Sequence, residues 1–313
     1  MRYFAGIDLG GTNIKGGIVD SDNNILYTRS LKTKPERGFD AVAQDICELI
    51  ESITKEAGVD IEYVGIGSPG AVDSTKGIVY FAGNLYWENA FLADYVQNKL
   101  NKKVYLANDA NCAALGEYLS LSDNNLKSMA MITIGTGVGF GFIYEGKMYT
   151  GATYGGCEFG HTTLILNGEQ CTCGKKGCIE AYASFTALVR DAEQYIIENP
   201  NGKLAKIKNE KGNIGGKILF EEAINNNEEA VFIVDRFLEY IGAGVVNIVN
   251  ILDPEMIVIG GGISNSSDYF IPKIENYVKE NAFCKQVKPP KIRVATSGND
   301  VGIIGAGRLG EFL

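Results

Sequence analysis

The chain has 313 residues, of which 45% are hydrophobic and 21% are charged, a composition typical of a folded protein and not of a disordered one. Lys and Arg number 29 against 38 Asp and Glu, a net charge of −9. This acidic balance, without a basic run, argues against nucleic acid or an anionic membrane as a partner. The length predicts roughly two domains.

The N-terminus, MRYFAGIDLGG, places an acid and a glycine pair where an export signal would be apolar, and no later stretch is long and apolar enough to span a bilayer. The seven cysteines are an odd number, so disulfides are not expected. Both observations predict a reducing, cytoplasmic location.

Strands joined by tight turns are predicted to open the chain: YFAGIDL, IKGGIVD and NILYTRSL, within residues 2–31. An amphipathic helix follows over 39–57 and ends at Gly58. Next come a strand YVGIGS, a turn PGAVD, a short helix near 91–100, and a strand VYLAN that leads into a helix from Asp109.

The opening pattern returns at residue 129, where MAMITIGTGVGFGFIYEGKMY again predicts strand, glycine turn and strand. This recurrence indicates two related halves, each with a glycine turn that contacts the same ligand. An irregular stretch over 151–180 is followed by helices, strands and one polar surface excursion. The alternation predicts the α/β class. These later elements are helices near 184–198, 216–226, 228–252 and 266–281, the excursion 199–216, strands MIVIG and KIRVAT, and a last helix from VGIIGAG.

One imidazole and three thiols in close succession predict a metal site. The only histidine, His161, stands just ahead of Cys171, Cys173 and Cys178. Three thiolates and one imidazole complete a tetrahedral zinc site with no position left for water, so the site is expected to be structural. Cys47, Cys112 and Cys284 are expected to be core or incidental thiols.

Two glycine turns could bind phosphate. In the first, Asp8-Leu9-Gly10-Gly11-Thr12, the glycines let backbone amides approach a ligand, and Asp8 is suited to holding the waters of Mg²⁺. A plain hairpin turn is the alternative. The second is Gly135-Thr136-Gly137-Val138-Gly139, where glycine could equally serve tight packing. Neither turn is a P-loop, and the first does not fit a dinucleotide fold. Gly260, Gly261 and Gly262, between a strand and a helix, could accept a nucleotide or only turn the chain.

Asp109 falls at a strand-to-helix junction, where it could cap the helix or act as a general base for a hydroxyl group that attacks phosphorus. Polar groups that a polyhydroxyl ligand requires stand near the ends of other predicted elements. They are Asn84, Asn108, Glu158, His161 and Glu180.

These segments resemble the ROK family of bacterial sugar kinases and repressors, most of all its glucokinase-type members. The resemblance spans the whole chain, and its most specific part is the spacing GH-x9-C-x-C-x4-C-x-E. Cys157 departs from the pattern, because the family often has a small residue there. The matching runs are DLGGTNIKGG, SPG at 68–70, NDAN at 108–111, IGTGVG, CEFGH and CTCGKKGCIE.

The resemblance implies an actin-like ATPase fold, of the ribonuclease H-like type, with two α/β domains and an interdomain active cleft. We expect a small domain at 1–118 with 300–313 and a large domain at 119–299. Asp109 maps to the family's base. The sugar contacts map to Asn84, Asn108, Asp109, Glu158, His161 and Glu180. ATP and Mg²⁺ map to Asp8, Gly10, Gly11, Thr12, Lys15, Gly135, Thr136 and Gly137, and the adenosine side maps to Gly260, Gly261 and Gly262.

The expected activity is ATP-dependent phosphorylation of the 6-hydroxyl of a hexose, with glucose preferred, by a homodimer or homotetramer that carries structural zinc. The rivals are a kinase for N-acetylmannosamine, N-acetylglucosamine, allose or fructose, and a sugar-binding repressor without catalysis. The repressor is disfavoured because only seven residues precede Asp8, and because the acidic balance is unsuited to DNA.

Overall fold

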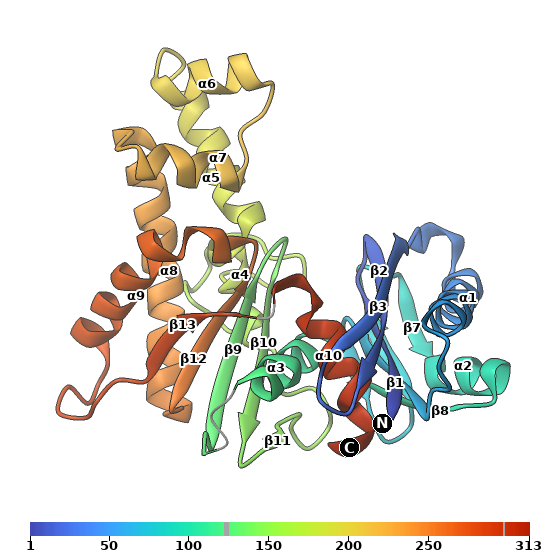
Figure 1. The fold of residues 1–313 in the computed structure, drawn as a ribbon. Helices are drawn as coiled ribbons and strands as arrows, with labels where there is room; N and C mark the ends of the chain where they lie inside the picture. Colours follow the sequence, from blue (N-terminus) through green and yellow to red (C-terminus); the bar gives the residue numbers. More distant parts are fainter. Residues whose placement is uncertain (122–124, 297) are drawn as a thin grey trace. The chain divides into compact units, whose positions relative to one another are not determined.

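We describe the fold from a computed structural model, in which residues 1–121, 125–296 and 298–313 are described (Figure 1). The chain divides into two compact units. The first comprises Met1–Met131, Gly141–Cys157 and Thr296–Leu313, and the second comprises Ile132–Phe140 and Glu158–Ala295. The domain limits expected from the sequence stay a prediction.

The first unit is built on a sheet with the strands β1 (Tyr3–Leu9), β2 (Asn13–Asp20), β3 (Ile25–Lys32), β4 (Tyr63–Ser68) and β8 (Lys103–Asn108). Their order is β3-β2-β1-β4-β8. The first three strands form antiparallel pairs, as predicted, whereas β4 runs parallel to β1 and β8 runs parallel to β4. The carboxyl ends of β1, β4 and β8 therefore lie at one edge of the sheet.

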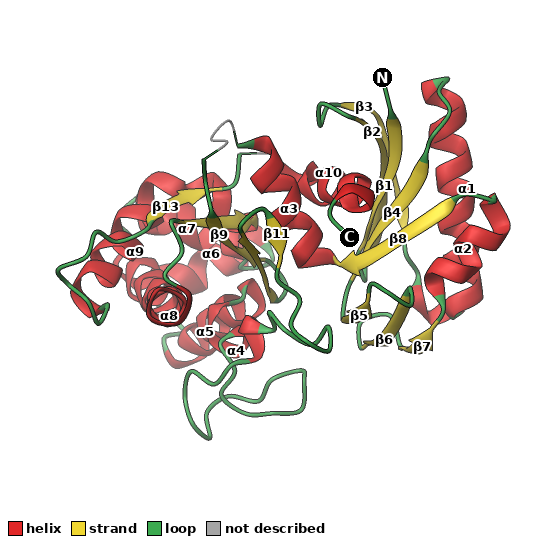
Figure 2. Cartoon of the chain, turned by 90° about the horizontal axis from the view of Figure 1, so that it is seen from below, coloured by secondary structure: helices red, strands yellow, loops and turns green. Residues whose placement is uncertain are grey.

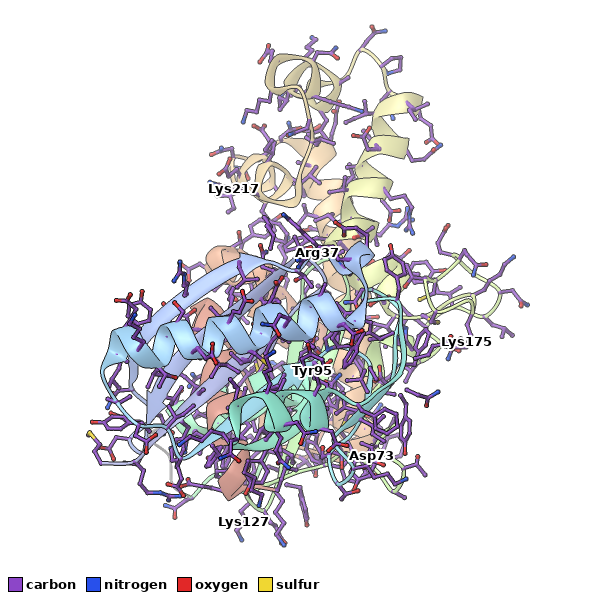
Figure 3. The ribbon with its side chains drawn as sticks, turned by 90° about the vertical axis from the view of Figure 1, so that its right-hand side faces the viewer. Arg37, Asp73, Tyr95, Lys127, Lys175 and Lys217 are labelled. Carbon is purple, nitrogen blue, oxygen red and sulfur yellow. The ribbon has the colours of Figure 1, made fainter. Side chains whose placement is uncertain are left out.

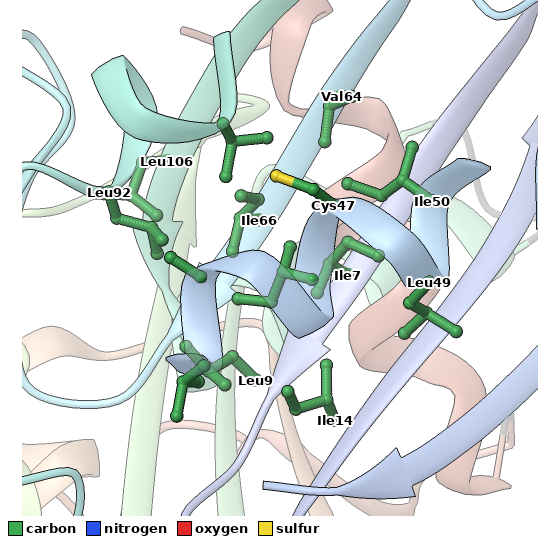
Figure 4. Close-up of a cluster of buried hydrophobic side chains, with 14 of the residues drawn as sticks. Ile7, Leu9, Ile14, Cys47, Leu49, Ile50, Val64, Ile66, Leu92 and Leu106 are labelled. Atoms are coloured by element: carbon green, nitrogen blue, oxygen red, sulfur yellow. The ribbon is translucent and has the colours of Figure 1, made fainter. Parts of the chain in front are cut away.

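Helices cover both faces of this sheet: α1 (Phe39–Ala57), α2 (Leu92–Leu100), α3 (Asp109–Ser120) and α10 (Val301–Arg308). Figure 2 shows α1 and α2 on one side of β1, β4 and β8, with α10 on the other. The predicted apolar side of α1 forms the core, and Figure 4 shows Leu49 and Ile50 among Ile7, Ile14 and Val64. Each fully buried Ile or Leu contributes about 1.5–3 kcal/mol.

Glycines allow α10 to approach its neighbours closely. A Cβ on Gly6 of β1 or Gly65 of β4 would lie 2.1 or 1.8 Å from a backbone oxygen of α10. On the side facing α3, a Cβ on Gly305 would lie 1.7 Å from the backbone oxygen of Cys112. These contacts fix α10 against β1, β4 and α3.

Replacing Gly305 by alanine is expected to destabilise the protein by about 3 kcal/mol or more, because backbone atoms cannot yield as a flexible side chain can. Gly215 is the matched control, since a Cβ there meets nothing within 4 Å. It is the N-cap of a helix, so Gly215→Ala should cost under about 1 kcal/mol. Urea unfolding of both variants measures the difference, and equal losses would contradict the packing described.

A small sheet of β5 (Ala71–Asp73), β6 (Ile78–Ala82) and β7 (Trp87–Ala90), in that order, was not expected from the sequence. The run PGAVD was predicted as a turn, but its last three residues form β5. The turn comes later, where the buried carboxylate of Asp73 accepts hydrogen bonds from the amides of Thr75 and Lys76. The sheet matters for the site because Asn84 stands between β6 and β7.

The second sheet contains β9 (Ser128–Ile134), β10 (Val138–Tyr144), β11 (Lys147–Met148), β12 (Met256–Gly261) and β13 (Lys291–Val294). Its order is β11-β10-β9-β12-β13, and β12 and β13 are parallel (Figure 1). The predicted strand, glycine turn and strand from residue 129 thus form β9 and β10. Strands alternating with helices confirm the predicted α/β class.

The helices of the second unit are α4 (Glu180–Ala183), α5 (Phe185–Glu198), α6 (Lys203–Lys211), α7 (Gly216–Ile224), α8 (Glu228–Leu252) and α9 (Ser267–Asn281). Short 3₁₀ turns complete the described elements: η1 (Pro35–Arg37), η2 (Phe159–His161), η3 (Gly262–Ser266), η4 (Gly298–Asp300) and η5 (Leu309–Glu311). Among the described residues, no helix combines the length and apolarity that crossing a bilayer requires.

The excursion predicted over 199–216 is wrong in one respect, because α6 forms inside it. The carboxylate of Glu229, at the start of α8, accepts hydrogen bonds from the amides of Lys203 and Leu204 at 3.1 and 2.9 Å. A first-turn cap supplied by a distant residue is invisible in the local sequence.

Candidate active site

Asp8 and Asp109 lie at the same edge of the first sheet. Asp8 is the penultimate residue of β1, and Asp109 begins α3 directly after β8. Gly67, which pairs with Asp8 from β4, lies between them. A Cβ on Gly67 would lie 3.4 Å from the Cα of Asp109 and 3.0 Å from the sulfur of Cys112. Glycine at this position therefore lets α3, and with it Asp109, approach the end of β1.

The buried thiol of Cys112 is close to both carboxyl groups. Burial raises the pKa of Cys112 well above its usual value, and Asp109 and Asp8 raise it further. A thiol so placed stays protonated and adds no third negative charge. Sequence reasoning classed Cys47, Cys112 and Cys284 as core or incidental thiols. Cys47 and Cys112 are buried, whereas Cys284 is exposed.

Asp8 has surroundings that suit a cation. Burial raises the pKa of its carboxyl, Lys15 on β2 opposes this change, and Asp300 adds to it. A buried carboxyl with a raised pKa and a second acid nearby suits Mg²⁺, whose positive charge would compensate both carboxylates. Sequence reasoning missed Asp300, because an acid just ahead of a helix is also typical of an ordinary cap.

Asn108, and not Asp109, is the N-cap of α3. Its side-chain oxygen accepts hydrogen bonds from the amides of Ala110 and Asn111 at 2.9 and 3.2 Å. Its amide nitrogen donates to the backbone oxygen of Gly70 at 3.0 Å. Asn108 therefore fixes the start of α3. The sequence left two functions open for Asp109, helix cap or general base, and the capping is done chiefly by Asn108.

The turn Gly10-Gly11-Thr12 presents backbone amides. The amide of Gly10 donates to the backbone oxygen of Asn13 at 2.9 Å. In the described part of the chain, the amides of Gly11 and Thr12 donate to no protein acceptor. Asn84 packs against this turn, since a Cβ on Gly11 would lie 3.2 Å from the amide nitrogen of Asn84. Such exposed amides suit a phosphate group.

The second glycine turn, Gly135-Thr136-Gly137, joins β9 to β10 and is held by α5. The amide of Phe185 donates to the oxygen of Gly135 at 2.8 Å, and the hydroxyl of Thr186 donates to the oxygen of Thr136 at 2.8 Å. With these carbonyl groups held by α5, the turn is ordered before any ligand binds.

Glu180, the first residue of α4, connects the second glycine turn to the loop that carries the cysteines. Its Oε2 accepts a hydrogen bond from the amide of Val138 at 3.0 Å. Its Oε1 accepts one from the hydroxyl of Thr172 at 3.1 Å and lies 3.7 Å from the sulfur of Cys171. Sequence reasoning assigned Glu180 a sugar contact only, because a contact with Val138 leaves no local signal.

The glycines Gly260, Gly261 and Gly262 close β12 and open η3. Gly261 has a φ of +90°, and a Cβ there would lie 2.2 Å from the backbone oxygen of Ile134 in β9. The positive φ and the close approach of β9 therefore explain why glycine is required at this position. A role for the cluster in binding adenosine stays a prediction.

The predicted metal ligands lie together. The ligand atoms of His161, Cys171, Cys173 and Cys178 are all within 4.8 Å of one another. The sulfur of Cys171 is 3.6 Å from Nδ1 of His161, and the sulfurs of Cys173 and Cys178 are also 3.6 Å apart. Zinc bonds of about 2.0–2.3 Å in a tetrahedron separate neighbouring ligand atoms by about 3.5–3.8 Å. The donor set and its spacing therefore fit zinc, which Nδ1 of His161 and the three cysteine sulfurs would hold.

The close spacing of the thiols in this cluster also favours binding of a cation. Burial, together with Cys173 and Cys171 nearby, raises the pKa of Cys178 to about 12. Burial opposes ionisation of Cys173 as well, but the amide of Lys175 and the two other thiols lower its pKa. Adjacent thiolates repel one another unless a metal compensates their charge. Lys175 itself lies in the irregular loop that carries these residues (Figure 3).

Glu158 stands just before the short turn η2, and His161 is the last residue of that turn. The protein desolvates the carboxyl of Glu158 and raises its pKa, an effect that His161 opposes and Glu180 reinforces. These three side chains are therefore near one another in the second unit. Cys157, just before them, has a left-handed φ of +66°, and its thiol donates to the backbone oxygen of Tyr149 at 3.0 Å.

The sequence-predicted residues thus form two groups. Asp8, Gly10–Thr12, Lys15, Asn84 and Asn108–Asp109 belong to the first unit. The second unit holds Gly135–Gly137, Glu158, His161, Glu180, Gly260–Gly262 and the cysteine ligands.

An α/β fold with a glycine turn in each unit, one of them beside paired carboxylates, defines the class of actin-like ATPases. The chain belongs to the ROK family, whose family model matches residues 4–311. Both the predicted family and the predicted fold are confirmed.

Relatives within the family include enzymes that act on sugars. A glucokinase of Halalkalibacterium halodurans is 33% identical over 98% of this chain and 94% of its own length. An N-acetyl-D-glucosamine kinase of Shigella boydii is 30% identical over 97% of each chain. The crystal structure of a ROK family glucokinase from Streptomyces griseus, in complex with glucose and AMPPNP, matches with a TM-score of 0.86 at 32% identity over 98% of each chain.

Proposed function

We propose that this chain is an ATP-dependent hexose kinase that phosphorylates the 6-hydroxyl group, with glucose as its preferred substrate. The observation that carries the proposal is the position of Asp109 at the sheet edge at which β1, with Asp8, leads into the first glycine turn. The glucokinases among the relatives support the choice of glucose.

In the proposed reaction, Asp109 accepts the proton of the 6-hydroxyl group while the oxygen of that hydroxyl group attacks the γ-phosphorus of ATP. The bond from that phosphorus to the bridging oxygen of ADP breaks, and ADP leaves. The exposed amides of Gly11 and Thr12, with the second glycine turn, bind phosphoryl oxygens where negative charge develops. Asp8, with Asp300 and Lys15 nearby, would hold Mg²⁺, which supplies positive charge to the phosphates when bound.

Sugar recognition is assigned to Asn84, Asn108, Glu158, His161 and Glu180. His161 would bind zinc through Nδ1 and would present Nε2, on the other side of its ring, to a sugar hydroxyl. Coordination fixes the tautomer, because the nitrogen that does not bind the metal must carry the proton. The zinc would be structural, with the three cysteines as its remaining ligands.

ADP formation by the purified protein, measured across glucose, mannose, fructose, allose, N-acetylglucosamine and N-acetylmannosamine, tests the proposal. The highest kcat/KM is expected for glucose, with the product phosphorylated at position 6. A higher kcat/KM for an N-acetylhexosamine would mean that the chain is a sugar kinase whose preferred substrate is not glucose. Binding of a sugar without ADP formation from any of them would favour a sensor of the repressor type.

Assembly and location complete the proposal. We place the chain in the cytoplasm as a homodimer or homotetramer. The clustered thiols support a reducing compartment, and the assembly rests on the family resemblance.

Replacing Glu180 by alanine is expected to raise the KM for ATP and the KM for sugar together, each by about threefold to tenfold, the effect of one lost hydrogen bond. Alanine has no acceptor, so both the amide of Val138 and the hydroxyl of Thr172 lose their partner. Glu239→Ala, on the exposed side of α8, is the control. A change in the sugar KM alone would show that Glu180 does not hold the phosphate turn.

A further inference from the structure

The residue that follows β3 is buried directly behind the first glycine turn. Thr33 is fully buried, although threonine is a polar residue in a segment that leaves the sheet. We propose that Thr33 is a positioning residue that aims the amide of Gly11 at a nucleotide phosphate. The inference rests on the proposed function for the identity of the ligand.

Thr33 makes hydrogen bonds to both ends of the turn. Its hydroxyl donates to the backbone oxygen of Gly10 at 2.6 Å. Its amide donates to the backbone oxygen of Thr12 at 3.1 Å. One side chain and its own backbone therefore hold the carbonyl groups on either side of Gly11.

The bond to Gly10 determines the direction of the next amide. A peptide group is planar and trans, so the carbonyl of Gly10 and the amide N–H of Gly11 point in opposite directions. Once the hydroxyl of Thr33 draws that carbonyl toward the protein, the N–H of Gly11 must point away from it. Within this turn, the amides of Gly11 and Thr12 are the two that donate to no acceptor in the described part of the chain.

Thr33 is itself held in place from a third direction. Its backbone oxygen accepts a hydrogen bond from the guanidinium of Arg37 at 3.2 Å. Arg37 forms an ion pair with Asp45 of α1. Because glycine residues give the turn little stiffness of their own, this rigid support is what orders it before the ligand arrives.

The experiment compares Thr33→Val with Thr33→Ser. Valine keeps the shape and removes the hydroxyl, whereas serine keeps the hydroxyl and removes a methyl group. Thr54→Val is the matched control in the same unit, because the hydroxyl of Thr54 is buried and has no hydrogen-bond partner among the residues that the structure describes. Affinity for AMPPNP is measured by calorimetry, and the KM values for ATP and glucose are measured by ADP formation.

Thr33→Val is expected to weaken AMPPNP binding and to raise the KM for ATP by about fivefold to tenfold, the factor that one hydrogen bond supplies. The KM for glucose should stay within about twofold, and Thr33→Ser and Thr54→Val should both match the wild type, since neither loses a made hydrogen bond. Equal AMPPNP affinity in Thr33→Val and wild type would overturn the inference, as would parallel losses for nucleotide and sugar.

Thr33→Ser decides the matter if the valine variant does not fold. Serine keeps the hydroxyl, so its affinity for AMPPNP should stay at the wild-type value. A loss of AMPPNP affinity of about fivefold or more in Thr33→Ser, the loss expected without a hydroxyl, would overturn the inference. Calorimetry needs no turnover, so this outcome is separate from the proposed function. A wild type that binds AMPPNP but forms no ADP with any sugar would refute the proposed function alone.

Discussion

Asp109→Asn is expected to lower kcat by about 10²-fold or more while glucose still binds, because asparagine cannot accept the proton of the attacking hydroxyl. The amide has nearly the size and shape of the carboxylate, so the start of α3 and its cap at Asn108 should be preserved. Calorimetry with glucose and steady-state ADP formation measure the two effects separately.

Asp94→Asn is the matched control for this change. Asp94 also stands in the first turn of a helix, α2, but it is exposed. Any general effect of removing a negative charge at a helix start should be similar for both variants and should amount to about 0.3–1 kcal/mol in stability. Turnover of Asp109→Asn within a factor of a few of the control would exclude Asp109 as the base.

Cys173→Ala is expected to remove zinc from the purified protein, to destabilise the metal loop by several kcal/mol, and to weaken sugar binding by about tenfold or more. The cause is that His161 is both a predicted ligand and a predicted sugar contact, and that Glu180 lies beside Cys171. Metal content is measured by elemental analysis, and glucose affinity by calorimetry.

Cys284→Ala is the control, because this thiol is exposed and lies outside the cluster. It should keep one zinc per chain and full affinity. A Cys173→Ala protein that has lost its metal but binds glucose as tightly as the wild type would refute the coupling between the metal and the sugar site.

Local patterns predicted much of the fold, because many elements carry their own signal. The spacing of apolar residues predicted α1 over the range in which it forms, and the junction after VYLAN predicted the start of α3 at Asp109. The cysteine spacing predicted that His161 and the three cysteines lie together, because the four donors that a closed zinc site needs in space are here also close in the chain.

What the sequence could not predict depends on distant contacts. The cap of α6 comes from Glu229, and the end of β5 is set by the turn that Asp73 holds. In the site, the bond of Glu180 to Val138 and the position of Thr33 behind Gly10 both join residues that are far apart in the chain. No local pattern distinguishes these side chains from ordinary polar ones.

A crystal structure with glucose and AMPPNP tests the central claim most directly. Our account predicts an oxygen of Asp109 within about 2.6–3.2 Å of the 6-hydroxyl of glucose, with that hydroxyl facing the γ-phosphate. A bound glucose whose 6-hydroxyl lies beyond hydrogen-bond reach of Asp109, or faces away from the nucleotide, would contradict it.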